Sequence, residues 1–286
     1  MKRRARAAQC GFTLPEAIIV IAVTGIIAAV VATFIRAPVQ GYFDSTRRAQ
    51  LSDLADTALR RMTRDLRLAL PNSVRVTSAG GSLYLEFLLT RGGGRYRAEP
   101  DASGSGDVLE FGSAASPYRF DVLGQMPTKP VTPGNSIVVY NLGPGFGASD
   151  AYQGSSGNLR TVSGVSGNTV TLSSAVAFPL PSTSSRFHVV EHAVSYVCTA
   201  NATDPAAGEL RRHWGYALAA AQPIAFPSGS DALLASGVAA CSIVYNPSAV
   251  AMRNGVVSLA LTLTRSSAGS SESVTLVQEA HVSNMP

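Results

Sequence analysis

The residue best placed to do chemistry is Glu16, a carboxylic acid at the start of a long uncharged segment. This segment covers residues 17–35, and only Thr24, Gly25 and Thr33 interrupt its apolar character. An ionised carboxylate is costly to hold in hydrocarbon, so an acid at this position is expected to serve a function and to need a partner. The simpler alternative is a carboxylate that stays wet at the lipid headgroups and faces the positive end of a helix dipole.

Other groups with chemical potential are sparse. His188 and His192 lie close to Glu191 in the sequence. In a strand, however, the two histidines would point to one face and Glu191 to the other, and no third metal ligand is evident. Asp101 and Asp107 enclose a Ser-Gly-Ser-Gly run without the ligand spacing of an EF-hand. We interpret the histidines as structural or surface residues and the aspartates as part of a solvated loop, with calcium as the alternative.

Enzymatic motifs are missing from the sequence. It has no nucleophile elbow, phosphate-binding loop or Cys-x-x-Cys pair. Trp214 and Tyr216, after a basic run, could form a recognition patch, although core burial is the preferred interpretation of Trp214. We expect a protein that is not an enzyme and that binds no cofactor or metal.

The uncharged segment has the length of a membrane-spanning helix. Residues 17–35 would extend over about 28 Å, close to the thickness of a bilayer's hydrocarbon layer. Residues 1–10 contain four basic side chains and no acid, so the N-terminus is expected to stay cytoplasmic. An ordinary secretory signal needs small residues after a shorter apolar core, whereas this core continues to Arg36.

The order of basic leader, Gly11, Phe12, Glu16 and apolar helix resembles the class III signal of type IV prepilins and type II secretion pseudopilins. The resemblance implies that a prepilin peptidase cuts between Gly11 and Phe12 and methylates the new amine of Phe12. It also implies that Glu16 pairs with the terminal amine of a neighbouring subunit, which would neutralise two buried charges and set the register of the helices. An interfacial role for Glu16 can precede this pairing.

Pro15 departs from the family, which usually has an aliphatic residue at this position. In a mature helix that begins at Phe12, Pro15 falls in the first turn, where its missing N–H costs no hydrogen bond. In the precursor it would interrupt a helix that continues into the leader. We therefore hypothesise that Pro15 keeps the cleavage site extended.

Removal of the leader would change the charge balance. The chain has 23 Lys and Arg against 18 Asp and Glu, and the leader holds four of the basic residues. The mature chain would keep 19 basic and 18 acidic residues, which argues against a nucleic-acid-binding domain.

The helix is expected to continue beyond the membrane, with a kink or local unwinding at Pro38 and Gly41. Apolar residues then recur at three- and four-residue spacing up to Leu70. These residues are Leu51, Leu54, Ala55, Ala58, Leu59, Met62, Leu66 and Leu70, and the opposite face carries Arg47, Asp53, Arg60, Arg61, Arg64 and Arg67. An exposed helix face is the preferred interpretation of this arginine stripe, with contact to lipid or a partner subunit as the alternative.

Beyond Pro71 the sequence predicts an antiparallel β head. Strands are expected at 82–89, 136–142, 159–165, 169–174, 240–246, 256–264 and 273–282, with Gly/Ser-rich loops at 101–107, 143–158 and 265–272. We expect one α+β domain organisation, similar to a pilin: leader 1–11, membrane or filament-core helix 12–36, amphipathic stem 37–70, and head 71–286 with an inserted sheet.

Three cysteines are present, and Cys10 would be lost with the leader. Cys198 and Cys241 remain as an even pair in an exported head, for which a disulfide is the simplest interpretation. Two buried thiols are the alternative.

Three further stretches, residues 70–76, 194–198 and 281–286, resemble minor pilins of the mannose-sensitive haemagglutinin (MSHA) type IV pilus. This resemblance implies an inner-membrane protein with a periplasmic head that later joins a pilus at the cell surface. Its expected partners are other pilins, the prepilin peptidase and the inner membrane, and no nucleic acid. The alternatives are a minor pseudopilin of a type II secretion system and a binding module or enzyme anchored by an uncleaved helix.

Overall fold

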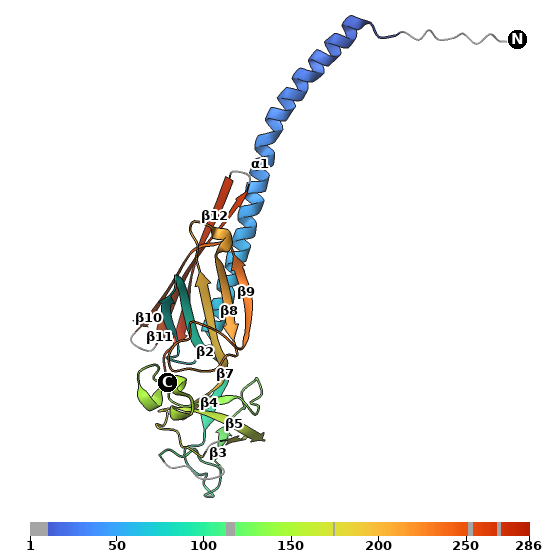
Figure 1. The fold of residues 1–286 in the computed structure, drawn as a ribbon. Coiled ribbons are helices and arrows are strands. Elements are labelled where there is room, and N and C mark those ends of the chain that lie inside the picture. The colour runs from blue at the N-terminus through green and yellow to red at the C-terminus, as the bar shows by residue number, and fades with distance from the viewer. Residues whose placement is uncertain (1–10, 113–117, 174, 251–253, 268–269) are drawn as a thin grey trace, which may run out of the picture. The chain divides into compact units, whose positions relative to one another are not determined.

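The chain consists of one long helix and a β-rich head (Figure 1). The computed structural model describes residues 11–112, 118–173, 175–250, 254–267 and 270–286. Contacts divide the chain into two compact units, residues 1–49 and residues 50–286. The helix, α1 (Leu14–Leu66), runs through both, and every strand belongs to the second unit. The α+β class predicted from the sequence is confirmed.

Within its described residues the head contains two sheets and three short 3-10 helices. The strands are β1 (Arg75–Ala79), β2 (Ser82–Tyr96), β3 (Arg119–Leu123), β4 (Ser136–Val138), β5 (Leu159–Ser166), β6 (Thr169–Leu172), β7 (Arg186–Thr199), β8 (Glu209–Trp214), β9 (Ser230–Ser236), β10 (Val238–Val250), β11 (Asn254–Ser267) and β12 (Ser270–Ser283). The 3-10 helices are η1 (Gly147–Ser149), η2 (Ala151–Ser156) and η3 (Pro205–Ala207).

The larger sheet contains a closed ring of strands. β2 and β7 pair over almost their whole length, from Ser82 opposite Thr199 to Arg95 opposite Arg186. At one end β3 pairs with β2, β4 pairs with β7, and β6 and β5 join β3 to β4. The order β2-β3-β6-β5-β4-β7 therefore closes on itself. Figure 1 shows β3, β4 and β5 gathered at the end of β2 and β7.

A run of three glycines lets β2 pass closely against β7 where the ring closes. A Cβ on Gly93 would lie 2.6 Å from the carbonyl oxygen of Phe187, and one on Gly94 would lie 2.9 Å from its ring. Side chains at these positions would push the two strands apart, so glycine is the residue that fits.

The ring has its own apolar core, made of aromatic and branched side chains. These are Tyr96, Leu109, Tyr118, Phe120, Val122, Val131, Ile137, Val139, Val162, Val170, Leu172, Phe178, Phe187 and Val189. The ring belongs to the same sheet as the strands around α1, and its closure was not predicted.

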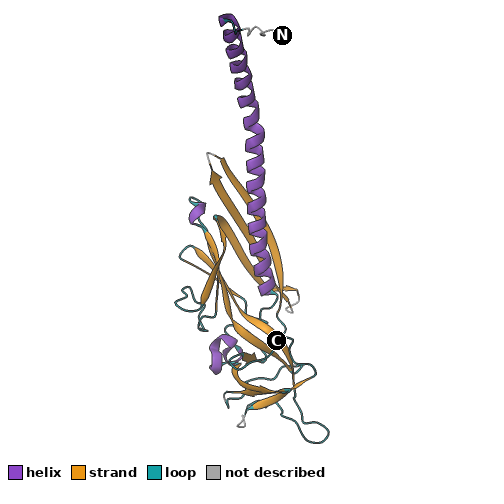
Figure 2. Ribbon diagram, turned by 90° about the vertical axis from the view of Figure 1, so that its right-hand side faces the viewer, coloured by secondary structure: helices purple, strands orange, loops and turns teal. Residues whose placement is uncertain are grey.

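A second core surrounds the C-terminal part of α1. The helix buries Leu51, Ala55, Ala58, Leu59, Met62 and Leu66 against β2, β7, β8 and β9 of the larger sheet and against all three strands of the sheet β10-β11-β12. Figure 2 shows this part of the helix lying along the strands. The apolar residues of the helix recur with a period of about 3.6, so they form one face, and this face lies in the core. Alternate residues of β11 form a second apolar face in the same core, and they are all buried: Val257, Leu259, Leu261 and Leu263.

The helix differs from the expectation in two respects. It remains helical through Pro38 and Gly41, so of the expected kink or local unwinding the unwinding is wrong. It also ends at Leu66 and not at Leu70, because the following residues bond to β2 instead: Leu70 N–H donates to Leu88 O (2.8 Å) and Thr90 N–H to Leu68 O (2.8 Å). Backbone pairing with β2 thus replaces the last helical turn.

Several strand limits also differ from the expectation. β2 is longer than residues 82–89, and β4 is shorter than residues 136–142. The loop expected at 265–272 is wrong: β11 and β12 continue in register to Ser267 opposite Ser270, because the facing serines and threonines pair with each other across the strands. The turn at Gly167-Asn168 between β5 and β6 is confirmed.

Candidate assembly site at the N-terminus

The residues of the predicted cleavage site precede the helix. Gly11, Phe12 and Thr13 are not helical, and Phe12 is 75% exposed. A Cβ on Gly11 would meet no atom within 4 Å. The segment is thus accessible in the isolated chain, as a protease substrate has to be.

Thr13 and Glu16 lie at the start of α1 and contact each other. The Ala17 N–H donates to Thr13 O at 3.1 Å, and the Thr13 hydroxyl donates to Glu16 Oε2 at 3.4 Å. A threonine followed three residues later by a glutamate is a sequence pattern common at helix starts. Glu16 is exposed in the first turn, close to the positive end of the helix. Pro15 is the second residue of α1, where its missing N–H breaks no helical bond.

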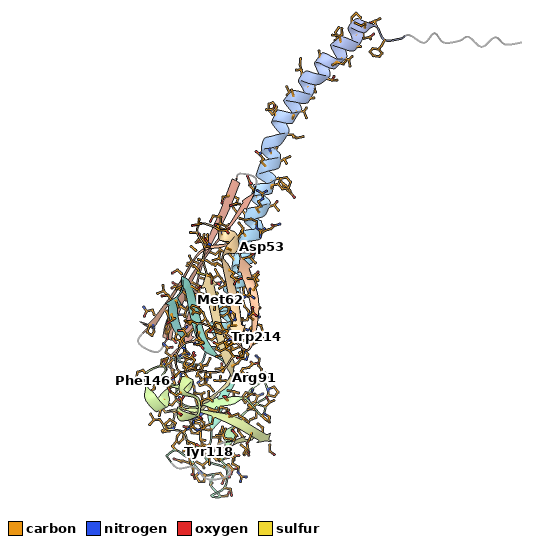
Figure 3. All side chains as sticks on the ribbon, in the orientation of Figure 1. Asp53, Met62, Arg91, Tyr118, Phe146 and Trp214 are labelled. Atoms are coloured by element: carbon orange, nitrogen blue, oxygen red, sulfur yellow. A yellow bond between two sulfur atoms is a disulfide. The ribbon has the colours of Figure 1, made fainter. Side chains whose placement is uncertain are left out.

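The N-terminal half of α1 exposes large apolar side chains around its whole circumference (Figure 3). They are Leu14, Ile18, Ile19, Val20, Ile21, Val23, Ile26, Ile27, Val30, Val31, Phe34 and Ile35, each at least 47% exposed. Thr24 and Thr33 satisfy their hydroxyls on helix carbonyls one turn back, at Val20 O (2.5 Å) and Ala29 O (2.8 Å). By length and composition this helix can cross a membrane. A helix that is apolar all round requires an apolar environment.

Comparison with family models finds the prokaryotic N-terminal methylation motif at residues 6–32. This match supports a type IV pilin or pseudopilin. The motif covers the predicted cleavage site, Glu16 and most of the apolar segment, and it implies processing by a prepilin peptidase and assembly with other pilins. No curated protein and no solved structure matches the chain. The pilin-type family that this motif describes is structural, and the apolar helix supports membrane anchoring.

The head of this pilin-like protein is cross-linked between its two sheets. A disulfide joins Cys198 of β7 to Cys241 of β10, with Cα atoms 6.7 Å apart. Cys198 and Cys241 line a small cavity together with Leu59 and Met62 of α1. The bond therefore holds the two sheets together at the level of the helix that they enclose. Cys10 lies outside the described residues.

The residues considered for metal binding do not converge. Among the described residues there is no group of three or more His, Cys, Asp or Glu side chains that could hold a metal ion. The Asp101 carboxylate instead accepts hydrogen bonds from the N–H groups of Ser103 and Ser105 and from the Ser103 hydroxyl. Asp101 therefore stabilises its own turn. His188 is partly buried, and burial together with Arg186 lowers its pKa to about 4.

Sequence reasoning missed two buried charged networks. In the first, Asp65 Oδ2 accepts from Tyr196 Oη at 2.9 Å and from Arg212 Nε at 2.8 Å, and Arg61 lies 3.4 Å from Oδ1. Burial and the neighbouring Asp65 carboxylate raise the pKa of Tyr196, so its hydroxyl stays a donor. The Arg212 guanidinium also lies over the ring of Trp214, 4.8 Å from its centre. This network joins α1 to β7 and β8.

The second network surrounds Glu86, whose side chain is fully buried. Glu86 accepts from Arg75 Nε at 2.6 Å and from Tyr216 Oη at 2.8 Å. Burial raises the pKa of Glu86, although Arg75 and Tyr216 oppose this rise. Arg75 also donates to Ala219 O and Ala220 O and lies over the ring of Tyr152 at 3.6 Å. No sequence motif marks either network, because their members are far apart in the chain.

Proposed function

We propose that the chain is a minor pilin of a type IV pilus, of the MshO type, which is incorporated into the filament or initiates it for attachment and motility. The observation that carries this proposal is the methylation motif on an exposed apolar helix, followed by a β head enclosing the end of that helix. The resemblance of residues 70–76, 194–198 and 281–286 to MSHA minor pilins supports the choice of pilus.

Processing by the prepilin peptidase would occur between Gly11 and Phe12, followed by methylation of the Phe12 amine. Gly11 and Phe12 are exposed and not helical, which supports access by the peptidase. Pro15 near the start of α1 fits the hypothesis that helix does not extend into the cleavage site. The N-terminus would lie in the cytoplasm and the head in the periplasm, as the basic leader and the disulfide-bonded head support.

Glu16 would then act in assembly. Removal of the leader creates a positive amine at Phe12, and the Glu16 carboxylate is exposed and accessible to the amine of a neighbouring subunit. In a filament core both charges would be removed from water, so each would need the other. The pair would also fix the axial position of one helix against the next.

Mass spectrometry of the N-terminus tests the class of protein. The full chain is extracted from membranes of strains with and without the prepilin peptidase. A chain that begins at N-methylated Phe12 only in the presence of the peptidase is the expected result. Gly11→Val should block the cut, whereas Gly25→Val, where a side chain also meets no atom within 4 Å, should be processed normally. An intact leader in both strains would indicate a plain membrane anchor and contradict the proposal.

The role of Glu16 has its own test. Glu16→Gln keeps the side-chain size and removes the charge, and Glu99→Gln does the same at an exposed position of the head. We expect both variants to be processed, and only Glu16→Gln to be missing from sheared filaments. Equal incorporation of both variants would contradict the assembly role.

The methylation motif is common to pilins and pseudopilins, so a GspJ-like minor pseudopilin of a type II secretion system is the second candidate. The two functions differ in the phenotype of a deletion strain. Loss of surface pili with normal secretion would support the minor pilin. Normal piliation with loss of enzyme secretion would replace it with the pseudopilin.

A further inference from the structure

An open cavity of about 530 Å³ lies beside α1, on the side where the larger sheet ends at β9. Its walls come from α1, β2, β7, β8, β9 and the segment between β3 and β4. The lining residues are Arg61, Arg64, Asp65, Leu68, Leu89, Lys129, Glu191, His192, Arg212, Trp214, Ala232 and Leu234. Figure 3 labels Trp214 and the nearby Arg91 in this part of the head.

The charges of this cavity are unbalanced. Four cations face two acids, and the buried Asp65 is already bound to Arg212. The side chains of Arg64 and Lys129 are exposed and form no hydrogen bond or ion pair with the described residues. A second open cavity, which shares Arg64 and Leu68, adds Arg60 and Arg67 to the same helix face. Arg60 pairs with Asp56 and Arg61 with Asp65, so the available cations are Arg64, Arg67 and Lys129, and these favour an anionic ligand.

One polar atom of a lining residue also lacks a partner. His192, which lines the cavity, has a buried Nε2 without a hydrogen-bond partner among the described residues. Buried polar atoms are normally satisfied, and an exception indicates a group that something else can satisfy. Trp214, Leu68 and Leu234 supply apolar surface to the same cavity.

The edge of β9 decides which kind of anion fits. β9 pairs with β8 on one side only, so in the described structure its other edge has unpaired backbone donors and acceptors. Ala232 and Leu234 of this strand line the cavity. An extended polypeptide can add to such an edge while its alternate side chains enter the pocket. An acidic glycan would leave the strand edge unused.

We propose that this cavity binds an extended acidic segment of a partner protein, which adds as a strand to β9 and places its carboxylates against Arg64 and Lys129. The arginine stripe of the stem is then a recognition surface and not only a solvated helix face. The proposal does not depend on which filament the protein enters, and a failure of N-terminal processing would leave it intact.

Trp214 gives a direct assay, because it is the only tryptophan in the chain. The full chain in dodecyl maltoside micelles is titrated with a capped eight-residue peptide of alternating Glu and Val, and Trp214 emission is followed. We expect a saturable change that weakens as salt is added. Arg64→Gln with Lys129→Gln should weaken the affinity by about fivefold, the effect of two exposed charge pairs.

A matched double variant and three probes make the test specific. Arg95→Gln with Arg186→Gln removes the same charge from exposed positions of the ring and should leave the affinity unchanged. An alternating Glu-Pro peptide has the same charge but cannot form a strand ladder, so it should bind more weakly, and an alternating Lys-Val peptide should not bind. Equal affinity for the Glu-Val and Glu-Pro peptides, an equal loss in both double variants, no binding at all, or tighter binding of a heparin octasaccharide would each overturn the proposal.

Discussion

The ion pair between Asp65 and Arg212 allows a quantitative test of how the head is held to the stem. Each side chain is only 7% exposed, and Arg212 Nε donates to Asp65 Oδ2 at 2.8 Å. Asp65→Asn keeps the size of the side chain but removes the charge that faces the Arg212 guanidinium. A buried charge that loses its partner costs roughly 3–5 kcal/mol, because water cannot replace the lost interaction. The amide oxygen of asparagine still accepts one hydrogen bond, so we expect a loss of about 3 kcal/mol, the lower end of this range.

Urea unfolding of the full chain in detergent micelles measures this loss. With a dependence on urea of about 3 kcal/mol per molar for a head of this size, the midpoint should fall by about 1 M. The matched control is Asp56→Asn, the same substitution on the same helix, where Asp56 pairs with Arg60 at 2.6 Å but both side chains are exposed. Exposed pairs of this kind contribute little, so the control should unfold close to the unmodified protein.

A double substitution separates the lost charge partner from other effects. Asp65→Asn with Arg212→Met removes both charges and leaves an apolar side chain of similar length over Trp214. Because no buried charge remains, the double variant should recover part of the stability that Asp65→Asn loses. The reasoning about burial is refuted if Asp65→Asn lowers the free energy of unfolding no more than Asp56→Asn does. It is also refuted if the loss in the double variant equals the sum of the losses in Asp65→Asn and Arg212→Met measured singly.

Three other predictions concern the disulfide, one histidine and the leader. Replacing Cys198 and Cys241 by serine opens a link with a sequence separation of 43 and should cost about 4 kcal/mol in the chain-entropy model; urea midpoints unchanged from those of the intact protein would contradict it. His188 has a pKa of about 4 in the folded head against 6.5 when unfolded, so the folded state binds fewer protons between these values. The free energy of unfolding should therefore be unaffected by this histidine above pH 6.5 and should fall by about 3 kcal/mol as the pH decreases from 6.5 to 4. Between pH 7 and 4 the urea midpoint should depend less on pH in His188→Gln than in the unmodified protein, whereas the exposed control His281→Gln should keep the full pH dependence. Pro15→Leu should slow cleavage of the leader in a pulse-chase experiment, and normal processing would refute the hypothesis that Pro15 keeps the site extended.

Local patterns in the sequence predicted the helix and much of its packing. The apolar residues of the stem from Leu51 to Leu66 are buried except for the partly buried Leu54, and the arginines opposite them are exposed. Such periodicity depends only on positions three or four apart in one element, so it can be seen in the sequence. The end of the helix depends on a competing bond from Leu70 to Leu88 of β2. That bond joins two elements, so no local pattern in the sequence predicts it.

The same difference applies to the sites. Gly11, Phe12 and Glu16 lie within six residues of one another, so their types and their order are enough to indicate a role. The basic cavity takes its residues from positions as far apart as 61 and 234, and the sequence favoured core burial for Trp214. In the structure Trp214 is partly buried: it packs against the core around α1, with Arg212 over its ring, and it pairs with the edge strand β9. Its surroundings therefore depend on the pairing of Arg212 with an acid 147 residues away, which no local pattern in the sequence shows.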